Sequence, residues 1–103
     1  MGLPVLKRSR FLEDYTGIVL TIREANPMAA HRFCDAVEAA IKLISTQPEI
    51  ARKAGFPKAP EARIWPMGRC PNYVILYRMT PTDVVFLRLL HGARDLPPLI
   101  PNE

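Results

Sequence analysis

The residues with the clearest chemical potential are several arginines and one histidine in the second half of the chain. Cleaving RNA through its 2′-hydroxyl needs a base for that oxygen, an acid for the leaving oxygen, and cations for the phosphate charge. His91 could supply the base or the acid. Arg63, Arg88 and Arg94 could bind the phosphate. The catalytic candidates for such a nuclease are Arg63, Arg88, His91 and Arg94.

The same cations could instead bind a macromolecule without catalysing anything. Side chains alternate between the two faces of a strand, so Arg63 and Trp65 share one face of a predicted strand. If the strand register lets Arg63, Arg78 and Arg88 converge, they form a concave basic floor beside the indole. The candidate partner-binding residues are Arg63, Trp65, Arg78, Arg88, His91 and Arg94. On this interpretation, Arg88→Glu would abolish binding and leave the melting temperature near that of the wild type.

Charge is distributed unevenly along the chain. Residues 1–50 carry six bases and six acids, whereas residues 51–103 carry eight bases and four acids, so the formal net charge of +4 lies entirely in the second half. Such an asymmetry favours an acidic partner, either a nucleic acid or an acidic protein segment. Ordinary solubility charge is the alternative explanation.

Length and composition predict one globular domain covering residues 1–103. The chain is 49% hydrophobic and 23% charged, which excludes a disordered or collagen-like polymer. The two cysteines, Cys34 and Cys70, are too few for a disulfide scaffold or a zinc site, so we expect free thiols and no metal or cofactor. No apolar run approaches the roughly 20 residues that span a bilayer. We therefore expect a cytoplasmic protein without membrane contact.

Two amphipathic helices are predicted after a short strand that starts at Val5 and Leu6. Ser9 is a suitable N-cap for the first helix, because its hydroxyl can accept from an unpaired backbone N–H. Asn26 and Pro27 end this helix and begin the second, which spans residues 27–45. Apolar residues recur on one face of each helix, so the pair should form an antiparallel hairpin.

A basic surface loop (residues 48–61) and three strands should follow the helices. The strands are expected over residues 62–67, 72–80 and 83–90, with a hairpin turn before Asp83. The predicted fold class is α+β in the order β-α-α-β-β-β, with the helical hairpin packed on one face of a twisted antiparallel sheet. The strand 62–67 or the N-terminal strand would offer an edge for a partner's segment.

Alternation along residues 83–90 predicts two largely apolar faces for the last strand. One face would carry Val84, Phe86, Arg88 and Leu90. The other would carry Val85, Leu87 and Leu89. One face packs on the helices, and the other either is covered or forms a partner groove around Arg88.

Several motifs along the chain resemble those of the RelE/ParE superfamily of type II toxin–antitoxin toxins, in its ParE branch. The resemblance covers nearly the whole chain. The most specific is residues 88–96 (RLLHGARDL), which is similar to the family's C-terminal motif. Residues 71–78 (PNYVILYR) fit the family's Tyr-Arg strand. Residues 26–30 (NPMAA), Pro48 and the pair Ala62 and Arg63 also fit.

The resemblance implies a small bacterial toxin with two helices packed on a twisted antiparallel sheet. The C-terminal segment of a cognate antitoxin wraps such toxins and neutralises them, giving a hetero-oligomer. ParE-like members poison DNA gyrase, inhibit growth and stabilise plasmids, whereas RelE-like members cut messenger RNA on the ribosome.

Three further interpretations stay open. RelE-like enzymes tend to place a tyrosine or histidine late in the chain. Here Tyr73 and Tyr77 lie a strand earlier and only His91 follows Phe86, so the acid is missing or unassigned. The sequence therefore favours a toxin that binds gyrase. The alternatives are a ribosome-dependent endoribonuclease and a non-toxic family member. A purely structural role for residues 91–95 is also open, with Gly92 at positive φ, Arg94 and Asp95 paired with neighbours to fix the tail, and His91 capping the end of the strand.

Overall fold

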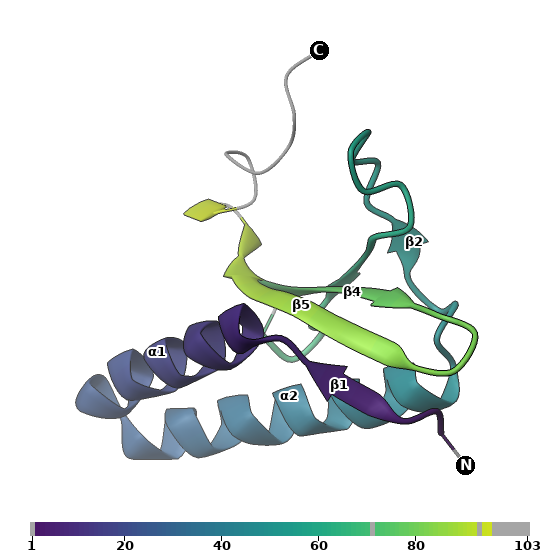
Figure 1. The fold of residues 1–103 in the computed structure, drawn as a ribbon. Helices are drawn as coiled ribbons and strands as arrows, with labels where there is room; N and C mark the ends of the chain where they lie inside the picture. Colours follow the sequence, from purple (N-terminus) through teal and green to yellow (C-terminus); the bar gives the residue numbers. More distant parts are fainter. Residues whose placement is uncertain (1, 71, 93, 96–103) are drawn as a thin grey trace.

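The computed structural model describes residues 2–70, 72–92 and 94–95 (Figure 1). Two long helices lie side by side beneath one sheet, as the sequence predicts. The described elements are β1 (Val5–Lys7), α1 (Ser9–Ala25), α2 (Pro27–Thr46), β2 (Arg52–Lys53), β3 (Arg63–Pro66), β4 (Tyr73–Met79) and β5 (Val84–His91).

The sheet has five strands in the order β1-β5-β4-β3-β2. The antiparallel meander β3-β4-β5 is confirmed. Two features correct the prediction. β1 pairs in parallel with β5, with Val5 opposite Val84, so the sheet is mixed. The loop 48–61 contains the short strand β2, whose Arg52 lies opposite Ile64, so β3 is an edge only beyond that residue.

The starts of the two helices differ. Asn26 caps α2 as predicted, because its side-chain oxygen accepts from the backbone N–H of Ala29 at 3.1 Å. The prediction that Ser9 caps α1 is wrong. The chain passes directly from β1 into α1, and Arg8 is the capping residue, with its carbonyl accepting from the N–H of Leu12. None of the described helices has the length and apolar character needed to cross a membrane.

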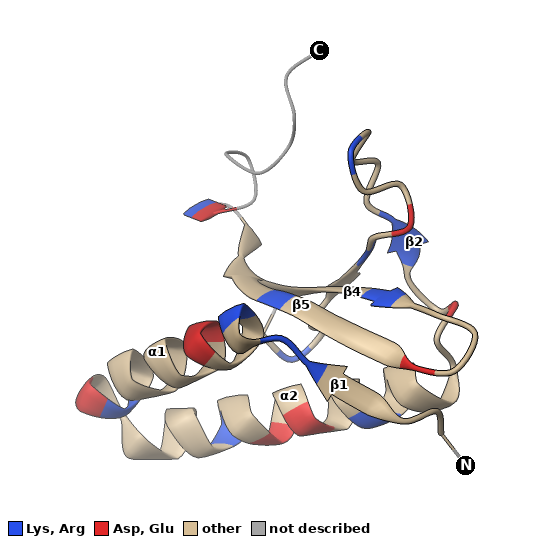
Figure 2. Ribbon diagram, in the orientation of Figure 1, with Lys and Arg blue, Asp and Glu red and all other residues tan. Residues whose placement is uncertain are grey.

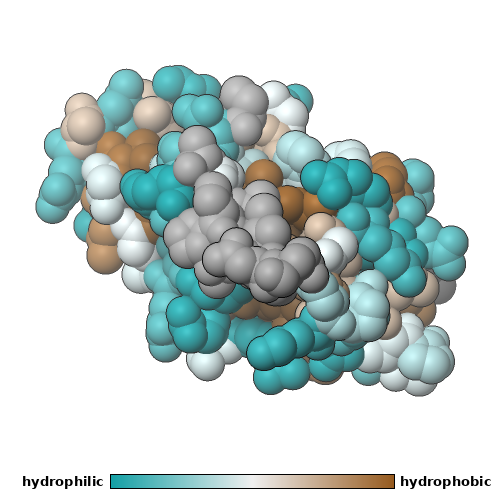
Figure 3. Space-filling view, turned by 90° about the horizontal axis from the view of Figure 1, so that it is seen from above, coloured by the Kyte–Doolittle hydropathy of each residue, from teal (hydrophilic) through white to brown (hydrophobic). Residues whose placement is uncertain are grey.

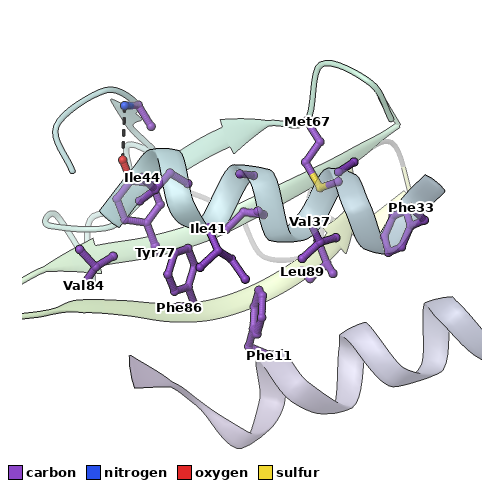
Figure 4. Packing of buried hydrophobic residues seen from close by; sticks show 14 residues of the cluster. Phe11, Phe33, Val37, Ile41, Ile44, Met67, Tyr77, Val84, Phe86 and Leu89 are labelled. Atoms are coloured by element: carbon purple, nitrogen blue, oxygen red, sulfur yellow. Dashed lines mark hydrogen bonds between the residues drawn. The ribbon is translucent and has the colours of Figure 1, made fainter. Parts of the chain in front are cut away.

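The main core lies between the helical hairpin and the sheet (Figure 4). Its buried members include four aromatic residues among aliphatic ones, and the ring centroids of Phe11 and Phe86 are 5.6 Å apart. Tyr77 is fully buried, yet its hydroxyl donates to the carbonyl of Pro48 at 2.8 Å and accepts from the N–H of Ala51 at 3.3 Å. These bonds satisfy the buried hydroxyl and fix the turn after α2.

A second hydrophobic cluster lies on the opposite face of the sheet. Its buried members are Ile64, Val74, Leu76 and Leu90. Ala54, Phe56 and Leu87 pack against it, so residues of the 48–61 loop cover part of this face. Figure 3 looks onto the molecule from this side and shows hydrophobic residues between hydrophilic ones.

A register shift in β5 overturns the predicted alternation. Leu76 lies opposite Arg88, but the next residue, Tyr77, lies opposite Phe86, so Leu87 is an extra residue. A bulge of this kind reverses the side-chain pattern beyond it. Phe86 therefore belongs to the main core and Leu90 to the second cluster, although the sequence pattern placed both on one face.

Hydrogen bonds close the predicted turn between β4 and β5. The N–H of Thr80 donates to the carbonyl of Asp83 at 2.8 Å, and the Thr80 hydroxyl oxygen accepts from the N–H of Asp83 at 2.9 Å. After β5 the prediction of a positive φ at Gly92 is wrong. Gly92 is helical, and among the described residues only Gly55 has a positive φ.

Candidate partner-binding surfaces

Arg88 is paired with a carboxylate from the first helix. Its Nε donates to Oδ2 of Asp14 at 2.8 Å and its Nη2 donates to Oδ1 at 3.2 Å, between residues 74 positions apart in the sequence. The side chains of Arg88 and Asp14 are 23% and 17% exposed. The hydrogen bond to Asp14 is the main cause that raises the pKa of Arg88. Arg88 therefore fastens α1 to the sheet.

The same carboxylate caps the edge of the sheet. Because β1 ends at Lys7, opposite Phe86, it has no residue to pair with the next part of β5. Asp14 Oδ2 accepts there from the backbone N–H of Leu89 at 3.0 Å. Arg88→Glu would place two carboxylates together at this point. The expectation that this variant keeps the wild-type melting temperature therefore conflicts with the structure.

His91, Arg94 and Asp95 form a closed local network. The backbone N–H of His91 donates to Asp95 Oδ2 at 3.0 Å, and the N–H of Arg94 donates to Nδ1 of His91 at 3.2 Å. Arg94 Nε donates to Asp95 Oδ1 at 3.0 Å, and this pair is the main cause that lowers the pKa of Asp95. The His91 ring packs edge-on against Tyr73. These contacts agree with the structural interpretation of the motif.

Arg63 binds backbone carbonyls of the turn after α2. Its Nη1 donates to the carbonyl of Ala51 at 2.6 Å and, more weakly, to that of Glu49 at 3.4 Å. Tyr77, directly opposite Arg63 in the sheet, holds the same turn through its hydroxyl. Burial is the largest cause that raises the pKa of Tyr77, and the nearby charge of Arg63 lowers it.

The predicted convergence of Arg63, Arg78 and Arg88 does not occur. Arg63 shares the helix-facing side with its cross-strand neighbour Tyr77. Arg78 follows Tyr77 in β4 and so points to the other face, opposite Val85. Figure 2 shows Lys and Arg positions distributed over β1, β2, β4 and β5. The single basic floor beside Trp65 is therefore absent from the described part of the molecule.

Trp65 instead lies in a groove along α2. It faces the helices from β3, opposite Ile75, and is only half-buried. Beside it is a mainly apolar hollow of about 220 Å³, lined by Ala36, Ala39, Ala40, Leu43, Trp65, Met67, Gly68 and Arg69. Small alanine side chains on α2 leave this space open below the indole.

A second hollow of about 310 Å³ continues the groove towards the start of α2. Its lining residues are Ile22, Ala29, Arg32, Phe33, Asp35, Arg69, Cys70 and Tyr73. Arg69 lines both hollows, so we treat the two as one surface and call it the Trp65 groove. The sequence pointed to Trp65 but missed Arg32 and Arg69. The sequence signal for the groove was Ala39, a small residue that lies next to the apolar stripe of the second helix.

The remaining titratable groups contribute no metal cluster in the described residues. Cys34 and Cys70 are free thiols, and burial raises the pKa of Cys70. The Tyr15 hydroxyl donates to Glu38 at 3.0 Å. Burial is the largest cause that raises the pKa of Tyr15, followed by this hydrogen bond.

Comparisons with known proteins agree on the family. Residues 5–96 match the family model described as the ParE toxin of a type II toxin–antitoxin system, parDE. A curated relative, Toxin RelE1 of Caulobacter vibrioides, is 33% identical over 95 residues, which cover 92% of this chain and 99% of that protein.

A solved structure described as the chromosomal ParDE TA system from P. aeruginosa has the same fold. The TM-score is 0.73 at 13% identity, covering 86% of this chain and 95% of that one. The family model matches residues 5–96, and the helical hairpin on a sheet and the sequence motifs agree with that match. The chain therefore belongs to the ParE toxin family of type II toxin–antitoxin systems.

Proposed function

We propose that this toxin acts in the cytoplasm by binding a macromolecular target, DNA gyrase, and that a cognate antitoxin neutralises it in a hetero-oligomeric complex. One observation carries the choice of binding over catalysis. The side chains that a nuclease would need are held by other parts of the same chain, in the ion pair of Arg88 with Asp14 and the network around His91. The choice of gyrase rests on analogy with ParE-like toxins.

An endoribonuclease is the second candidate, because one relative carries the name Toxin RelE1. Phosphate binding would need free guanidinium groups near a proton-transfer group. Arg63 donates to backbone carbonyls, and Nδ1 of His91 already accepts a hydrogen bond. These contacts favour the binding toxin.

The Trp65 groove is our proposed site for the antitoxin. Its floor is apolar, and two of its lining residues, Arg32 and Arg69, carry positive charge against the single carboxylate of Asp35. An extended or helical antitoxin segment could bury apolar side chains against Trp65 and place acidic groups near the arginines. β3 is also unpaired with β2 beyond Ile64, which leaves part of an edge beside the groove.

A gyrase assay with the purified full-length chain tests the proposed target. We expect loss of DNA supercoiling and accumulation of cleaved DNA when toxin and gyrase are mixed, and reversal of both when the antitoxin is added first. Primer extension on cellular transcripts after induction is the companion measurement. Discrete cuts within codons, with gyrase unaffected, would establish the nuclease instead. Growth unaffected by expression of the chain alone would contradict both activities.

A further inference from the structure

A row of residues spaced four apart begins at Arg8, the residue that caps α1, and continues along the outward face of the helix. Its members are Arg8, Leu12, Thr16, Leu20 and Glu24, all exposed. Leu12 and Leu20 are 46% and 45% exposed, whereas Phe11 on the inward face is fully buried. We call this row the α1 ridge. It leaves two large apolar side chains in water on a helix whose other face already supplies the core.

The order of residues in the α1 ridge is self-complementary. Rows spaced four apart form the ridges that pack between the grooves of a neighbouring helix. If a second copy packs antiparallel about Thr16, Leu12 of each copy faces Leu20 of the other. The same arrangement places Arg8 of each copy opposite Glu24 of the other. A two-fold axis therefore gives two leucine contacts and two ion pairs from one ridge.

The surface beside the ridge has room for the incoming side chain. A shallow hollow of about 230 Å³ is lined by Tyr15, Thr16, Val19 and Leu20. In the antiparallel arrangement this hollow lies opposite Leu12 of the second copy, so the leucine enters it as a knob enters a hole. Gly17, next to the central residue, has open space on its outer side, so close approach of the backbones meets no obstacle.

The other charges near the ridge are compatible with this pairing. In the same register Arg23 faces Ser9 of the second copy, and Glu13 faces Val19. Neither residue therefore lies directly opposite a like charge, which would cost free energy. A partner of a single charge sign would meet Arg8 at one end of the ridge and Glu24 at the other, and could match only one of them.

We propose that the α1 ridge is a self-association surface, on which a second copy of this chain packs antiparallel through Leu12 and Leu20. One helix pair makes a small interface, so the dimer is weak, with a dissociation constant on the order of 10–100 μM. The ridge contains none of the residues that line the Trp65 groove, so this proposal is independent of the antitoxin site.

Analytical ultracentrifugation of the full-length chain, made by cell-free synthesis, tests the proposal. We expect the apparent mass to rise from monomer towards dimer with concentration, and Leu12→Glu or Leu20→Glu to remain monomeric. Ile50→Glu is the matched control, because Ile50 is an exposed apolar residue outside α1, and this variant should dimerise like the wild type. Circular dichroism verifies that each variant is folded.

Exchange of the terminal charges tests the antiparallel register. Arg8→Glu and Glu24→Arg should each weaken dimerisation about five- to tenfold, since each places like charges together at both ends. An equimolar mixture of the two variants should recover wild-type affinity. In the mixed dimer, both end contacts again join an acidic side chain of one variant to a basic side chain of the other.

Two results would overturn the proposal. A wild-type chain that stays monomeric at several times the predicted dissociation constant excludes self-association, and if Leu12→Glu then weakens antitoxin capture, the ridge belongs to the antitoxin. Dimerisation that is insensitive to Leu12→Glu and Leu20→Glu, or a mixture of charge variants that recovers no affinity, excludes this interface.

Discussion

The carboxyl end of β5 and the Trp65 groove both contain arginines, but they use them differently. At the end of β5, Arg88 and Arg94 are each paired with a carboxylate of the same chain. In the groove, Arg32 and Arg69 have no ion-pair partner within the described residues. The first region pairs its charges within the fold, whereas the second leaves them available to a partner.

This difference shows why residue type alone does not predict function. The family-like motif around His91 contains the residue types most often found in catalysis, yet its contacts are local and internal. The groove is lined mostly by apolar side chains, including four alanines and one tryptophan, which carry no obvious chemistry. Satisfied charges indicate a scaffold, and unpaired charges beside an open apolar floor indicate a docking surface.

The largest expected effect is on the scaffold, through Asp14→Ala. This change leaves the half-buried Arg88 without its partner and removes the acceptor for the N–H of Leu89. We expect a loss of about 2–3 kcal/mol in the free energy of unfolding, measured by urea denaturation. Glu13→Ala, at the exposed neighbouring position, should change the free energy by less than about 0.5 kcal/mol. Equal effects of the two changes would contradict the scaffold role.

Ala39→Glu should affect binding and leave stability unchanged. Ala39 is an exposed helical position that lines the Trp65 groove, so a longer acidic side chain blocks the floor and repels an acidic segment. We expect antitoxin affinity to fall by about 10- to 100-fold in calorimetry. Lys42→Glu is a matched exposed change on α2 outside the two hollows and should have a smaller effect. Unchanged affinity in Ala39→Glu would place the antitoxin elsewhere.

Arg63→Met sharpens the comparison, because Arg63 was predicted to bind a partner. It retains much of the aliphatic stem but loses the guanidinium bonds to the carbonyls of Ala51 and Glu49. We expect the free energy of unfolding to fall by about 1–2 kcal/mol in urea, with antitoxin affinity near the wild-type value. A variant with normal stability and lost affinity would restore Arg63 to the partner surface.

The smallest expected effect concerns Asp95 and pH. Its pKa is lowered below the ordinary value of 3.8, mainly by Arg94, so the folded state favours the carboxylate. The resulting stability is present at neutral pH and is lost as the pH falls through the lowered pKa. Asp95→Asn should therefore differ from the wild type by less than about 0.5 kcal/mol at pH 7, and by less still below pH 4. A difference that grows in acid would contradict this sign.

Local patterns predicted the helical hairpin and the meander well. Apolar periodicity marked both helices, and the Asn26 cap with Pro27 marked their junction. Turn residues between two β-rich segments predicted the β4–β5 hairpin. These features depend on neighbours in the sequence, where the physical preferences of each residue act directly.

Non-local features were not predictable in the same way. β2 consists of two exposed residues, Arg52 and Lys53, which have no strand-like pattern of their own. The parallel pairing joins the first and the last described strands, β1 and β5, which are about 80 positions apart in the sequence. Strict alternation of side chains along a strand cannot predict the bulge at Leu87. It therefore could not predict the contact between Arg88 and Asp14 either. Residues 96–103 lie outside the described structure, as does part of the family-like motif 88–96.

The pairing of the first strand with the last affects how the protein can fold during its synthesis. A ribosome makes β5 long after β1, so the nascent chain holds a helical hairpin without the sheet that buries it. Contacts between distant segments also form slowly. The nascent chain therefore cannot complete its core until β5 has been made, and a prematurely terminated copy lacks the strand that β1 and α1 both contact.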